Sequence, residues 1–519
     1  MIARATSILG GGLLLCLAFI LIGCSYTEPQ HQTNTRAFSS IETQDTRLGK
    51  GITHLTEKHK GLTGIHMLGD PHDAFATRML LTRAAERSLD IQSYIWRNDT
   101  TGILLLEALH DAADRGVRVR LLIDDNGNAG LDTQLAALDS HPNIEVRLFN
   151  PFYFRKLKVL GYLTNFKRAN RRMHNKSFTA DNQATIIGGR NIGDEYFGAD
   201  PDALFSDLDI LAMGPVVQEL SNDFDRYWAS QSSFPVAQVL PAAAPQDLNA
   251  LSLAANNTER SAAAESYMKV TSELPIIQQL IKGDLPLEWA PARMVSDDPA
   301  KGLDDVGAKN LLIHQLSDIV GKPARSLNLV SAYFVPTETG THTLVSMAQN
   351  GVAIQVFTNA LAATDVVAVH AGYAKWRKDL LTAGIKLYEM KRAKSAPPES
   401  SFRPGRLGSS GSSLHAKTFS ADGMLFFVGS YNFDPRSAKL NTELGFIIES
   451  PVLAQQIDKA FNTDIPERSY EVRLSADGSL YWLEHKNGRL LRHDTEPDTN
   501  ALQRASVWFV SQLPIDWLL

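Results

Sequence analysis

Apolar and polar positions follow the same order of segments twice along this chain. In each half, a short apolar strand pattern is followed by a helical pattern and then by a second apolar strand pattern. Both helical patterns stop at a glycine, Gly116 and Gly351, as helices commonly do. Strand, helix and strand form a βαβ unit, so we predict an α/β fold in which each half is an α/β sandwich with a mixed sheet. The six segments are residues 87–96, 104–115, 117–123, 325–334, 343–350 and 352–357.

A polar motif is repeated with one spacing. It reads H-x-K, four residues, D, six residues, G-[GS]-x-N, and its copies lie a constant 241 positions apart (174 to 415, 181 to 422). A scatter of unrelated polar residues would not keep this spacing. We therefore predict two duplicated domains related by pseudo-two-fold symmetry, with one active site at their interface. The paired residues are His174 and His415, Lys176 and Lys417, Asp181 and Asp422, Gly189 and Ser430, and Asn191 and Asn432.

The repeated residue types suit chemistry on a phosphodiester. Histidine can attack phosphorus as a neutral imidazole or transfer a proton near neutral pH, so two histidines can divide these tasks. On an extended strand, the lysine two positions later shares the face of its histidine, where its ammonium group can neutralise phosphate oxygens. The glycine-rich pair allows close approach of the backbone to a ligand, and asparagine side chains can donate N–H groups. We predict as catalytic His174, Lys176, His415 and Lys417, and as substrate-binding Gly189, Ser430, Asn191 and Asn432.

Asp181 and Asp422, the aspartates of the two motifs, are placed with the catalytic residues in this prediction. Each follows its histidine and lysine by a few positions, where an aspartate also commonly fixes a turn. A turn-fixing or lysine-orienting role therefore stays open beside direct contact with substrate.

These motifs resemble the signature of the phospholipase D superfamily, in which two H-x-K-x4-D motifs are each followed by a glycine-rich G-x-N turn. The resemblance covers nearly the whole chain after the leader. It implies a two-step reaction that uses neither a metal ion nor a cofactor. Four further stretches are similar to bacterial cardiolipin synthase C-type phosphatidyltransferases: residues 206–209, 432–437, 441–444 and 513–519.

The resemblance also implies individual roles. The histidine of the first motif, His174, attacks the phosphodiester and becomes a phosphohistidine, while His415 protonates the departing alcohol and then deprotonates the incoming one. In related enzymes an acidic residue downstream of each motif orients the histidine of that motif. This assigns Asp207 to His174 and Glu443 to His415. Asp209 is a rival of Asp207, because the two candidate carboxylates differ by five residues in their spacing from the histidines.

The N-terminus carries an apolar run at residues 8–22, which is short for a membrane span and suits the core of a signal peptide. It ends in Leu-Ile-Gly-Cys24, which resembles the lipobox of bacterial lipoproteins, so we predict cleavage before Cys24 and lipidation of this cysteine. A plain N-terminal membrane anchor is the alternative. The expected location is the periplasmic face of the bacterial cell envelope. The predicted divisions are a signal peptide at 1–23, a tether at 24–50, a first domain at 51–250 and a second domain at 251–519.

Charge bears on the partner of this protein. Loss of Arg4 with the leader takes the formal charge from −6 to −7, which disfavours wrapping nucleic acid. Seven cations nevertheless alternate with aromatic and aliphatic residues over 152–172, just before His174. This composition favours a segment that rests in the headgroup layer of a membrane, with a solvated basic face as the alternative. The Gly/Ser-rich stretch at 405–413 is either a lid over the site or an uninvolved surface loop.

These features together predict a membrane-tethered phosphatidyltransferase that forms cardiolipin from two phospholipids, with phosphatidylglycerol and phosphatidylethanolamine as expected substrates. A phospholipase D that releases phosphatidic acid is the main alternative. A lipid-binding protein without activity is disfavoured because both motifs keep their His, Lys, Asp and Asn, and a nuclease is disfavoured by the charge and the tether. The donor headgroup, the choice of inner or outer membrane and the need for an accessory protein stay open.

Overall fold

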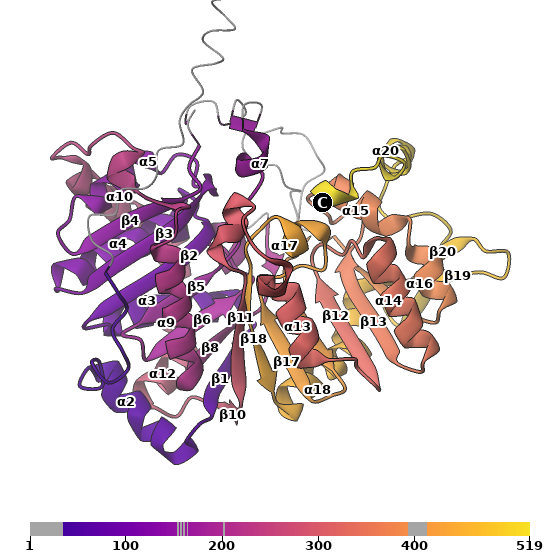
Figure 1. Ribbon diagram of the computed structural model, residues 1–519, viewed down its shortest axis with the longest axis horizontal. Coiled ribbons are helices and arrows are strands. Elements are labelled where there is room, and N and C mark those ends of the chain that lie inside the picture. The colour runs from indigo at the N-terminus through magenta and orange to yellow at the C-terminus, as the bar shows by residue number, and fades with distance from the viewer. Residues whose placement is uncertain are drawn as a thin grey trace, which may run out of the picture.

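Two large mixed β-sheets, one in each lobe, form the centre of the protein in the computed structural model (Figure 1). The structure describes residues 35–152, 155, 158, 161–162, 165–200, 203–392 and 413–519. The predicted signal peptide at 1–23, Cys24 and residues 405–412 of the predicted lid lie outside the described residues. Helices pack against both sheets, and the predicted α/β class is confirmed.

The first sheet has its parallel strands toward one end, where β2 pairs with β3 and β3 with β4, and its other pairings are antiparallel. Its order is β10 (Glu288–Ala290), β1 (Thr63–Leu68), β8 (Asp209–Met213), β6 (Ala184–Gly188), β5 (Ser177–Ala180), β2 (Ser88–Ile95), β3 (Arg118–Gly127), β4 (Ile144–Phe149) and β9 (Ser233–Pro235).

The second sheet repeats this order from β18 to β14, with parallel pairs β12 to β13 and β13 to β14. The repeated βαβ units predicted from the periodicity are therefore confirmed. Its strands are β11 (Ala292–Ser296), β18 (Leu444–Glu449), β17 (Leu425–Gly429), β16 (Lys417–Ala421), β12 (Ser326–Ser331), β13 (Ala353–Asn359), β14 (Lys386–Met390), β19 (Ser469–Leu474), β20 (Leu480–Lys486) and β21 (Arg489–His493). A short pair, β7 (Phe205–Ser206) and β15 (Ser413–Leu414), joins the lobes.

Helices connect the strands in both lobes. The first lobe and its extension contain α2 (Arg47–Thr56), α3 (Pro71–Ala84), α4 (Thr100–Asp114), α5 (Asp132–Asp139), α7 (Phe166–Ala169), α8 (Asp194–Phe197), α9 (Pro215–Trp228), α10 (Asp247–Glu259), α11 (Ala262–Ser272) and α12 (Pro275–Lys282). The second lobe contains α13 (Leu312–Val320), α14 (Thr337–Gln349), α15 (Val367–Ala374), α16 (Arg377–Thr382), α17 (Pro435–Lys439), α18 (Pro451–Asn462), α19 (Asp464–Arg468) and α20 (Ala501–Ser511). Short 3-10 turns are η1 (Glu57–His59), η3 (Val236–Gln238), η4 (Pro299–Leu303), η5 (Ala308–Asn310) and η6 (Asp516–Leu518).

The crossover helix α4 shows how the sequence sets these elements. The side chain of Asp99 caps the helix by accepting a hydrogen bond from the backbone N–H of Gly102 at 3.1 Å. Leu105 and Leu109 are buried in the core of the first lobe. Gly116 follows with a φ of 90°, a left-handed conformation that favours glycine and stops the helix. The helix therefore begins and ends where local chemistry dictates.

Two equivalent backbone contacts relate the lobes. Met173, one residue before His174, forms a parallel bridge with Thr442, and Leu414, one residue before His415, pairs with Ser206. Met173 and Leu414 lie 241 positions apart, as the motif residues do. Thr442 and Ser206 each precede a predicted histidine-orienting carboxylate. Reciprocal contacts of this kind are what a two-fold axis produces, so the pseudo-two-fold arrangement of the duplicated domains is confirmed.

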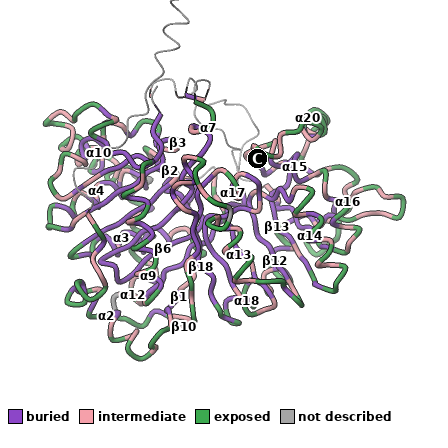
Figure 2. The backbone as a smooth tube through the Cα atoms, in the orientation of Figure 1, coloured by how far each residue is buried: buried purple, intermediate pink, exposed green. Residues whose placement is uncertain are grey.

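The interface between the lobes is apolar and buried. One continuous core cluster combines Ile187 and Ile210 of the first sheet with Val428 and Phe446 of the second. Figure 2 shows buried backbone running through the middle of the molecule, where the two sheets meet. Removal of this apolar surface from water stabilises the two lobes as one body, and the catalytic motifs lie at its edge.

The boundary between the lobes differs from the predicted one at residue 250. Strand β10 pairs with β1 of the first sheet, and Leu251, Tyr267 and Ile276 are buried in the first-lobe core. The second sheet begins with β11 at Ala292. Residues 251–290 therefore belong to the first lobe, and the prediction was wrong because no Pro/Gly-rich linker marks the change of lobe.

The predicted tether at 24–50 is also too long at its C-terminal end. Ala37, Thr43 and Thr46 are buried, and the backbone N–H of Ala37 donates to both carboxylate oxygens of Asp225, at 3.0 and 2.9 Å. From residue 35 onward the chain packs on the first lobe. In the described part of the chain, no helix combines the length and the apolar character that a membrane crossing requires.

Candidate active site

The two histidines are held at the seam by backbone bonds from the opposite lobe. His174 lies just before β5, and its N–H donates to the carbonyl of Thr442 at 2.9 Å. His415 lies just before β16, and its N–H donates to the carbonyl of Ser206 at 2.8 Å. Both residues are more than nine-tenths buried. The predicted site at the interface therefore brings the two motifs together.

Each imidazole is oriented by a carboxylate of the other lobe. Nδ1 of His174 lies 2.8 Å from Oε2 of Glu443, and Nδ1 of His415 lies 2.6 Å from Oδ2 of Asp207. The residues predicted to orient the histidines are therefore in contact with them, but the pairing is crossed. The prediction that each carboxylate serves the histidine of its own motif was wrong, because the two-fold axis places each carboxylate across the seam.

Asp209, the rival of Asp207, is engaged elsewhere. Its carboxylate accepts from the guanidinium group of Arg78 at 2.8 Å and from the backbone N–H of Arg190 at 3.1 Å. It is fully buried at the base of the turn that follows β6. Its contacts are those of a structural carboxylate.

The hydrogen bonds of His174 identify its tautomer. Nδ1 also lies 3.1 Å from the backbone carbonyl of Ser430, which can only accept. Nδ1 therefore carries the hydrogen and Nε2 keeps its lone pair. The same assignment follows for His415, because the carboxylate of Asp207 is ionised and accepts from Nδ1. Both Nε2 atoms are thus left for chemistry on a substrate.

Two lysines add positive charge beside the histidines. The ammonium group of Lys176 donates to the carbonyl of His174 at 2.6 Å, and that of Lys417 donates to the carbonyl of His415. Lys417 also lowers the pKa of His174, and Lys176 lowers that of His415. Both lysines and both histidines therefore act in one electrostatic site, as predicted from the repeated H-x-K.

Burial sets the protonation of this site. It lowers the pKa of His174 well below the usual value and, with Lys417, lowers that of His415 to about 4. It also lowers the pKa of Lys176 to about 7 and raises that of Glu443 to about 7. Burial opposes ionisation of Asp207 too, but His415 and Lys417 outweigh it and bring the pKa of Asp207 to about 2. Both imidazoles are therefore neutral at pH 7, and Asp207 is the ionised partner.

Three aromatic side chains that the sequence did not single out pack on the imidazoles. The ring of Tyr94 meets His174 edge to face at 5.0 Å, and that of Tyr196 meets His415 in the same way at 5.2 Å. Phe205 lies 5.4 Å from the ring of His415. Tyr94 ends a repeated strand, but nothing in the motif spacing marks these rings as part of the site. They hold the imidazole planes and limit access of water.

The glycine-rich turns position the carboxylates of Asp207 and Glu443. A Cβ at Gly189 would lie 2.0 Å from Oδ1 of Asp207, so glycine at this position makes room for the partner of His415. At the equivalent position, the hydroxyl of Ser430 donates to Glu443 and accepts from the backbone N–H of Leu444 at 3.0 Å. Gly189 and Ser430 therefore position Asp207 and Glu443, and their predicted contact with substrate stays a prediction.

The two motif asparagines are hydrogen-bonded within their own lobes. The side-chain carbonyl of Asn191 accepts from the backbone N–H of Ile95 at 3.3 Å, and its amide group donates to the hydroxyl of Tyr196 at 2.8 Å. The carbonyl of Asn432 accepts from the backbone N–H of Tyr333 at 3.3 Å. Each asparagine is thus fixed by the end of a repeated strand. Their predicted contact with substrate stays a prediction.

Asp181 and Asp422 do not contact the histidines. Oδ1 of Asp181 accepts from the backbone N–H groups of Arg87 and Ser88 at 2.8 and 2.9 Å, and Asp422 binds residues 324–326 in the same way. Both have positive φ, 50° and 56°, in the turn at the far end of the strand that follows the H-x-K. The predicted catalytic role is therefore replaced by the turn-fixing alternative.

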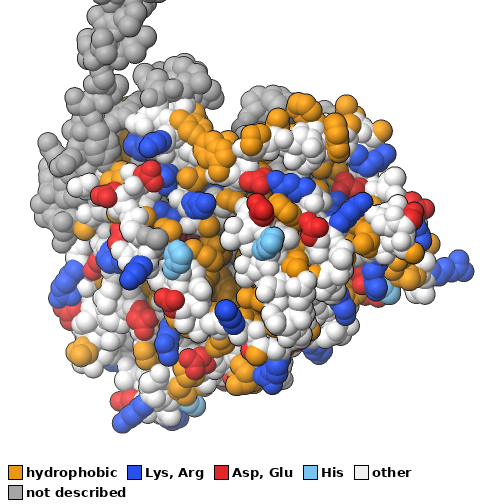
Figure 3. All heavy atoms as spheres, turned by 45° about the vertical axis from the view of Figure 1, so that its right-hand side comes forward, with side chains coloured by type: hydrophobic (Ala, Val, Ile, Leu, Met, Phe, Trp, Pro, Cys, Tyr) orange, Lys and Arg blue, Asp and Glu red, His pale blue; other side chains and the backbone are white. Residues whose placement is uncertain are grey.

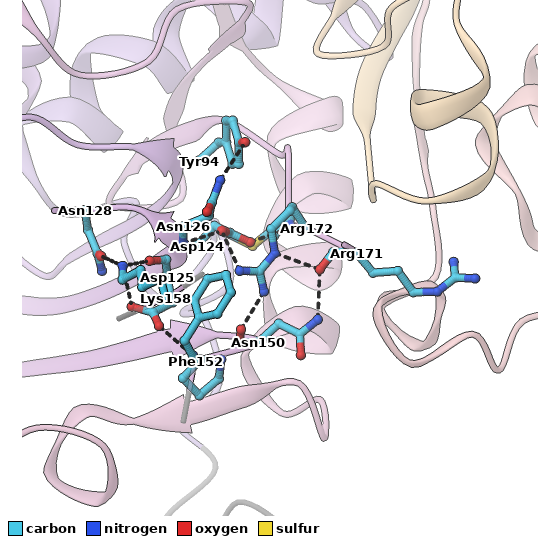
Figure 4. Close-up of polar contacts among 12 residues, drawn as sticks. Tyr94, Asp124, Asp125, Asn126, Asn128, Asn150, Phe152, Lys158, Arg171 and Arg172 are labelled. Atoms are coloured by element: carbon cyan, nitrogen blue, oxygen red, sulfur yellow. Dashed lines mark hydrogen bonds and ion pairs between the residues drawn. The ribbon is translucent and has the colours of Figure 1, made fainter. Parts of the chain in front are cut away.

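Most of the described cations in the basic segment at 152–172 bind other groups of the protein. Figure 4 shows Lys158 directed at Asp125, and Arg172 directed at Asp124 and the carbonyl of Asn150. Arg171 points away from this cluster toward the second lobe, where it binds Asp304 and the carbonyl of Lys439. Arg171 and Arg172 are buried as well as bound, so they do not face lipid phosphates and the prediction for these two residues was wrong. Lys167 differs, since its side chain is 87% exposed. Residues 153, 154, 156, 157, 159, 160, 163 and 164 lie outside the described part.

Both lobes match the same protein family. A model described as "Cardiolipin synthase, PLD-like domain" matches residues 80–228 and 316–465, one copy in each lobe. The chain belongs to the phospholipase D-like cardiolipin synthase family. It is 48% identical over 473 residues to cardiolipin synthase C of Escherichia coli (strain K12), covering 91% of this chain and 100% of that protein.

Two more distant proteins are also similar to this chain. A cardiolipin synthase of Clostridium perfringens (strain 13) is 24% identical over 404 residues, 77% of this chain and 70% of that protein. The crystal structure of phosphatidylserine synthase from Haemophilus influenzae Rd KW20 is similar with a TM-score of 0.57 at 13% identity, covering 90% of this chain and 100% of that one. The latter likeness shows the fold, with its two phospholipase D-like lobes. The chain is a phosphatidyltransferase of this superfamily.

Proposed function

We propose that this protein joins two phospholipids into cardiolipin through a phosphohistidine intermediate. The observation that carries the proposal is the pair of buried imidazoles, each with Nδ1 bound to a carboxylate of the other lobe and Nε2 unused. Similarity to cardiolipin synthase C over the whole length of that protein supports transfer to a lipid.

In the first step, Nε2 of His174 attacks the phosphorus of a phospholipid. A bond forms between nitrogen and phosphorus, and the bond from phosphorus to the headgroup oxygen breaks. When the lipid binds, His415 takes up a proton from solvent at Nε2 and becomes an imidazolium; it gives this proton to that oxygen, so the headgroup leaves as an alcohol. The ionised Asp207 favours His415 for this role, because it stabilises the imidazolium that must supply the proton. The phosphate anion of the bound lipid raises the pKa of His415 in the same direction.

In the second step, His415 takes the proton of an incoming hydroxyl group. The resulting oxygen attacks the phosphorus, the bond to His174 breaks, and the free imidazole is restored. When the hydroxyl belongs to the glycerol headgroup of phosphatidylglycerol, the product is cardiolipin. Lys176 and Lys417 are fixed beside the histidines and hold the negative charge that develops on the phosphoryl oxygens, with Asn191 and Asn432 as N–H donors.

The second part of the proposal concerns location. The lipobox-like Leu-Ile-Gly-Cys24 supports cleavage and lipidation, which would tether the chain to a membrane on the periplasmic side of the envelope. Replacing Cys24 with Ala should leave an unprocessed precursor, detected by mass spectrometry of the N-terminal peptide. A mature N-terminus without acyl chains would disprove the lipoprotein assignment. If an accessory protein is required, membranes that contain this protein should form cardiolipin, whereas the purified protein should not.

The main experiment measures the products of the purified protein in vesicles of phosphatidylethanolamine and phosphatidylglycerol. Cardiolipin should form with little phosphatidic acid. The His415→Ala protein should form both products more slowly than the wild type. Vesicles with either lipid alone identify the donor headgroup. If phosphatidic acid is the only product at every composition, and also when membrane extract is added, the protein is a phospholipase D and transfer is wrong.

A further inference from the structure

The helix α20 presents an apolar face to solvent. It packs on α15 through Val507 and Val510, which contribute to a small buried cluster with Leu361 and Ala371. On the other side of the helix, Leu502, Trp508 and Phe509 are 77%, 67% and 61% exposed. The helix is therefore apolar on the face that it buries and also on the face that it exposes.

This arrangement is unusual for a helix on the surface of a protein in water. Such helices carry charged and polar residues on their outer face. The sequence of α20, ALQRASVWFVS, contains one ionised residue, Arg504, and its guanidinium group donates to the carbonyl of Thr499 at 2.9 Å. Leu502, Phe509 and Leu513 follow one another at helical spacing along the outer face. Two adjacent exposed aromatic residues, Trp508 and Phe509, widen this face.

The apolar surface continues across the seam between the lobes. Leu513 and Trp517 are 38% and 56% exposed, and the ring of Trp517 contacts that of Phe166, in α7 of the first lobe, at a centroid distance of 6.4 Å. Figure 1 places α7, α15 and α20 along one edge of the molecule, and Figure 3 shows hydrophobic side chains gathered along that edge. We call this surface the apolar rim, and its residues are Phe166, Leu502, Trp508, Phe509, Leu513 and Trp517.

The apolar rim is fastened to both catalytic motifs through Arg436. The guanidinium group of Arg436 donates to the carbonyl of Leu518 at 2.9 Å, and its backbone N–H donates to that of Leu519 at 2.6 Å. Arg436 lies four residues after Asn432 and also donates to the side-chain carbonyl of Asn170 at 2.6 Å, four residues before His174. The rim therefore lies beside the residues that lead into the site from both lobes.

The geometry points to a phospholipid bilayer as the partner of the apolar rim. We infer that Trp508, Phe509 and their neighbours enter the interfacial layer of the membrane, so that the site meets phosphodiester groups at headgroup depth. This inference rests on the proposed function, since the substrate of a lipid transfer reaction keeps its acyl chains in the bilayer. Tryptophan and phenylalanine are the side chains that suit this layer.

Charge at the edge of the rim favours the same partner. Lys167 follows Phe166 directly with its side chain 87% exposed, in a solvent-exposed ion pair with Asp304 at 3.9 Å, and Lys439 is exposed on α17, which carries Arg436. Both ammonium groups are placed to meet anionic headgroups such as phosphatidylglycerol while the aromatic rings lie deeper. Because most cations of the 152–172 segment are bound inside the protein, the apolar rim, rather than that basic segment, supplies the main contact with the membrane.

The test compares turnover on two forms of substrate. The double variant Trp508→Ser, Phe509→Ser should lose at least tenfold in cardiolipin formation on phosphatidylethanolamine and phosphatidylglycerol vesicles. On short-chain phospholipids below their micellar concentration its rate should stay within twofold of the wild type. The matched control is Leu490→Ser, Leu491→Ser, which removes two exposed apolar residues from β21, outside the rim. This control should match the wild type in both assays.

A second measurement detects insertion directly. Vesicles that contain brominated acyl chains should quench the tryptophan fluorescence of the wild type, and Trp508→Phe should lose a large share of that quenching while keeping its activity. Equal quenching of the two proteins, or unchanged vesicle turnover in the double variant, overturns the inference. If the double variant is normal on vesicles and fails only in cells, the rim binds a protein and the inference is wrong. Failure of the wild type on both substrate forms would instead count against the proposed function.

Discussion

Nδ1 of His174 is hydrogen-bonded at 2.8 Å to the carboxylate of Glu443, 269 residues further along the chain. The reciprocal pair, His415 and Asp207, spans 208 residues in the opposite direction. Neither lobe therefore holds a motif histidine together with the carboxylate that orients it. The duplication does not provide two sites, because each half supplies the orienting group that the other half needs.

Because the pairs are crossed, we expect substitution of Asp207 to impair the acid His415, and substitution of Glu443 to impair the nucleophile His174. Asp207→Asn weakens His415 as the acid, so its first step should slow by about 10²–10⁴-fold with a natural headgroup. A phosphatidyl ester of 4-nitrophenol needs no protonation to leave, and this variant should release nitrophenol in a rapid burst. Glu443→Gln impairs the nucleophile and should show no such recovery. Stopped-flow absorbance measures the burst, and recovery in Glu443→Gln alone would reverse the roles of the histidines.

The two histidine variants should differ in whether they trap a covalent adduct. His415→Ala keeps the nucleophile, so incubation with the nitrophenyl ester should trap a phosphatidyl group on His174. His174→Ala should trap none. Both variants should lose turnover on phospholipid vesicles. Peptide mass spectrometry at alkaline pH, where phosphohistidine survives, locates the adduct, and an adduct on His415 would contradict the assignment.

The pH dependence of kcat/KM should follow the loss of charge on Lys176. Burial lowers its pKa to about 7, against the opposing effect of Glu443. A lysine with a lowered pKa loses its charge as the pH rises, so kcat/KM should fall above about pH 7. Bound phosphate stabilises the ammonium form and raises this pKa, so kcat should fall only at higher pH. Lys176→Arg keeps its charge and should move the alkaline fall of kcat/KM upward. Lys167→Arg, at an exposed lysine, should leave the profile unchanged.

The motif aspartates should matter for stability rather than turnover. Asp181 is fully buried and binds three backbone N–H groups, so Asp181→Ala leaves these donors unpaired and should lower the free energy of unfolding by about 2–3 kcal/mol. Asp422 makes the equivalent bonds at a partly exposed turn, where water can replace it, and Asp422→Ala should lose only about 1 kcal/mol. Urea unfolding measures both values. A fall in kcat of more than tenfold in folded Asp181→Ala protein would restore a catalytic role.

The sequence alone determined much of the site. The repeated H-x-K and G-x-N spacing identified His174, His415 and both lysines, and the apolar periodicity identified the repeated strands and crossover helices, because these are local patterns. Asp207 and Glu443 were identified as candidate carboxylates by resemblance. The rings of Tyr94 and Tyr196 were missed, since tyrosine beside an imidazole leaves no spacing signal.

Only the tertiary structure decided which groups meet. It paired Glu443 with His174 across the seam, moved residues 251–290 to the first lobe, and directed Arg171 and Arg172 into the protein rather than toward lipid. It also left Trp508 and Phe509 exposed on a helix whose other face is buried. The physical reason is that periodicity encodes the direction of a side chain relative to its own helix or strand. Contact between residues hundreds of positions apart depends on how one sheet rotates and packs against the other.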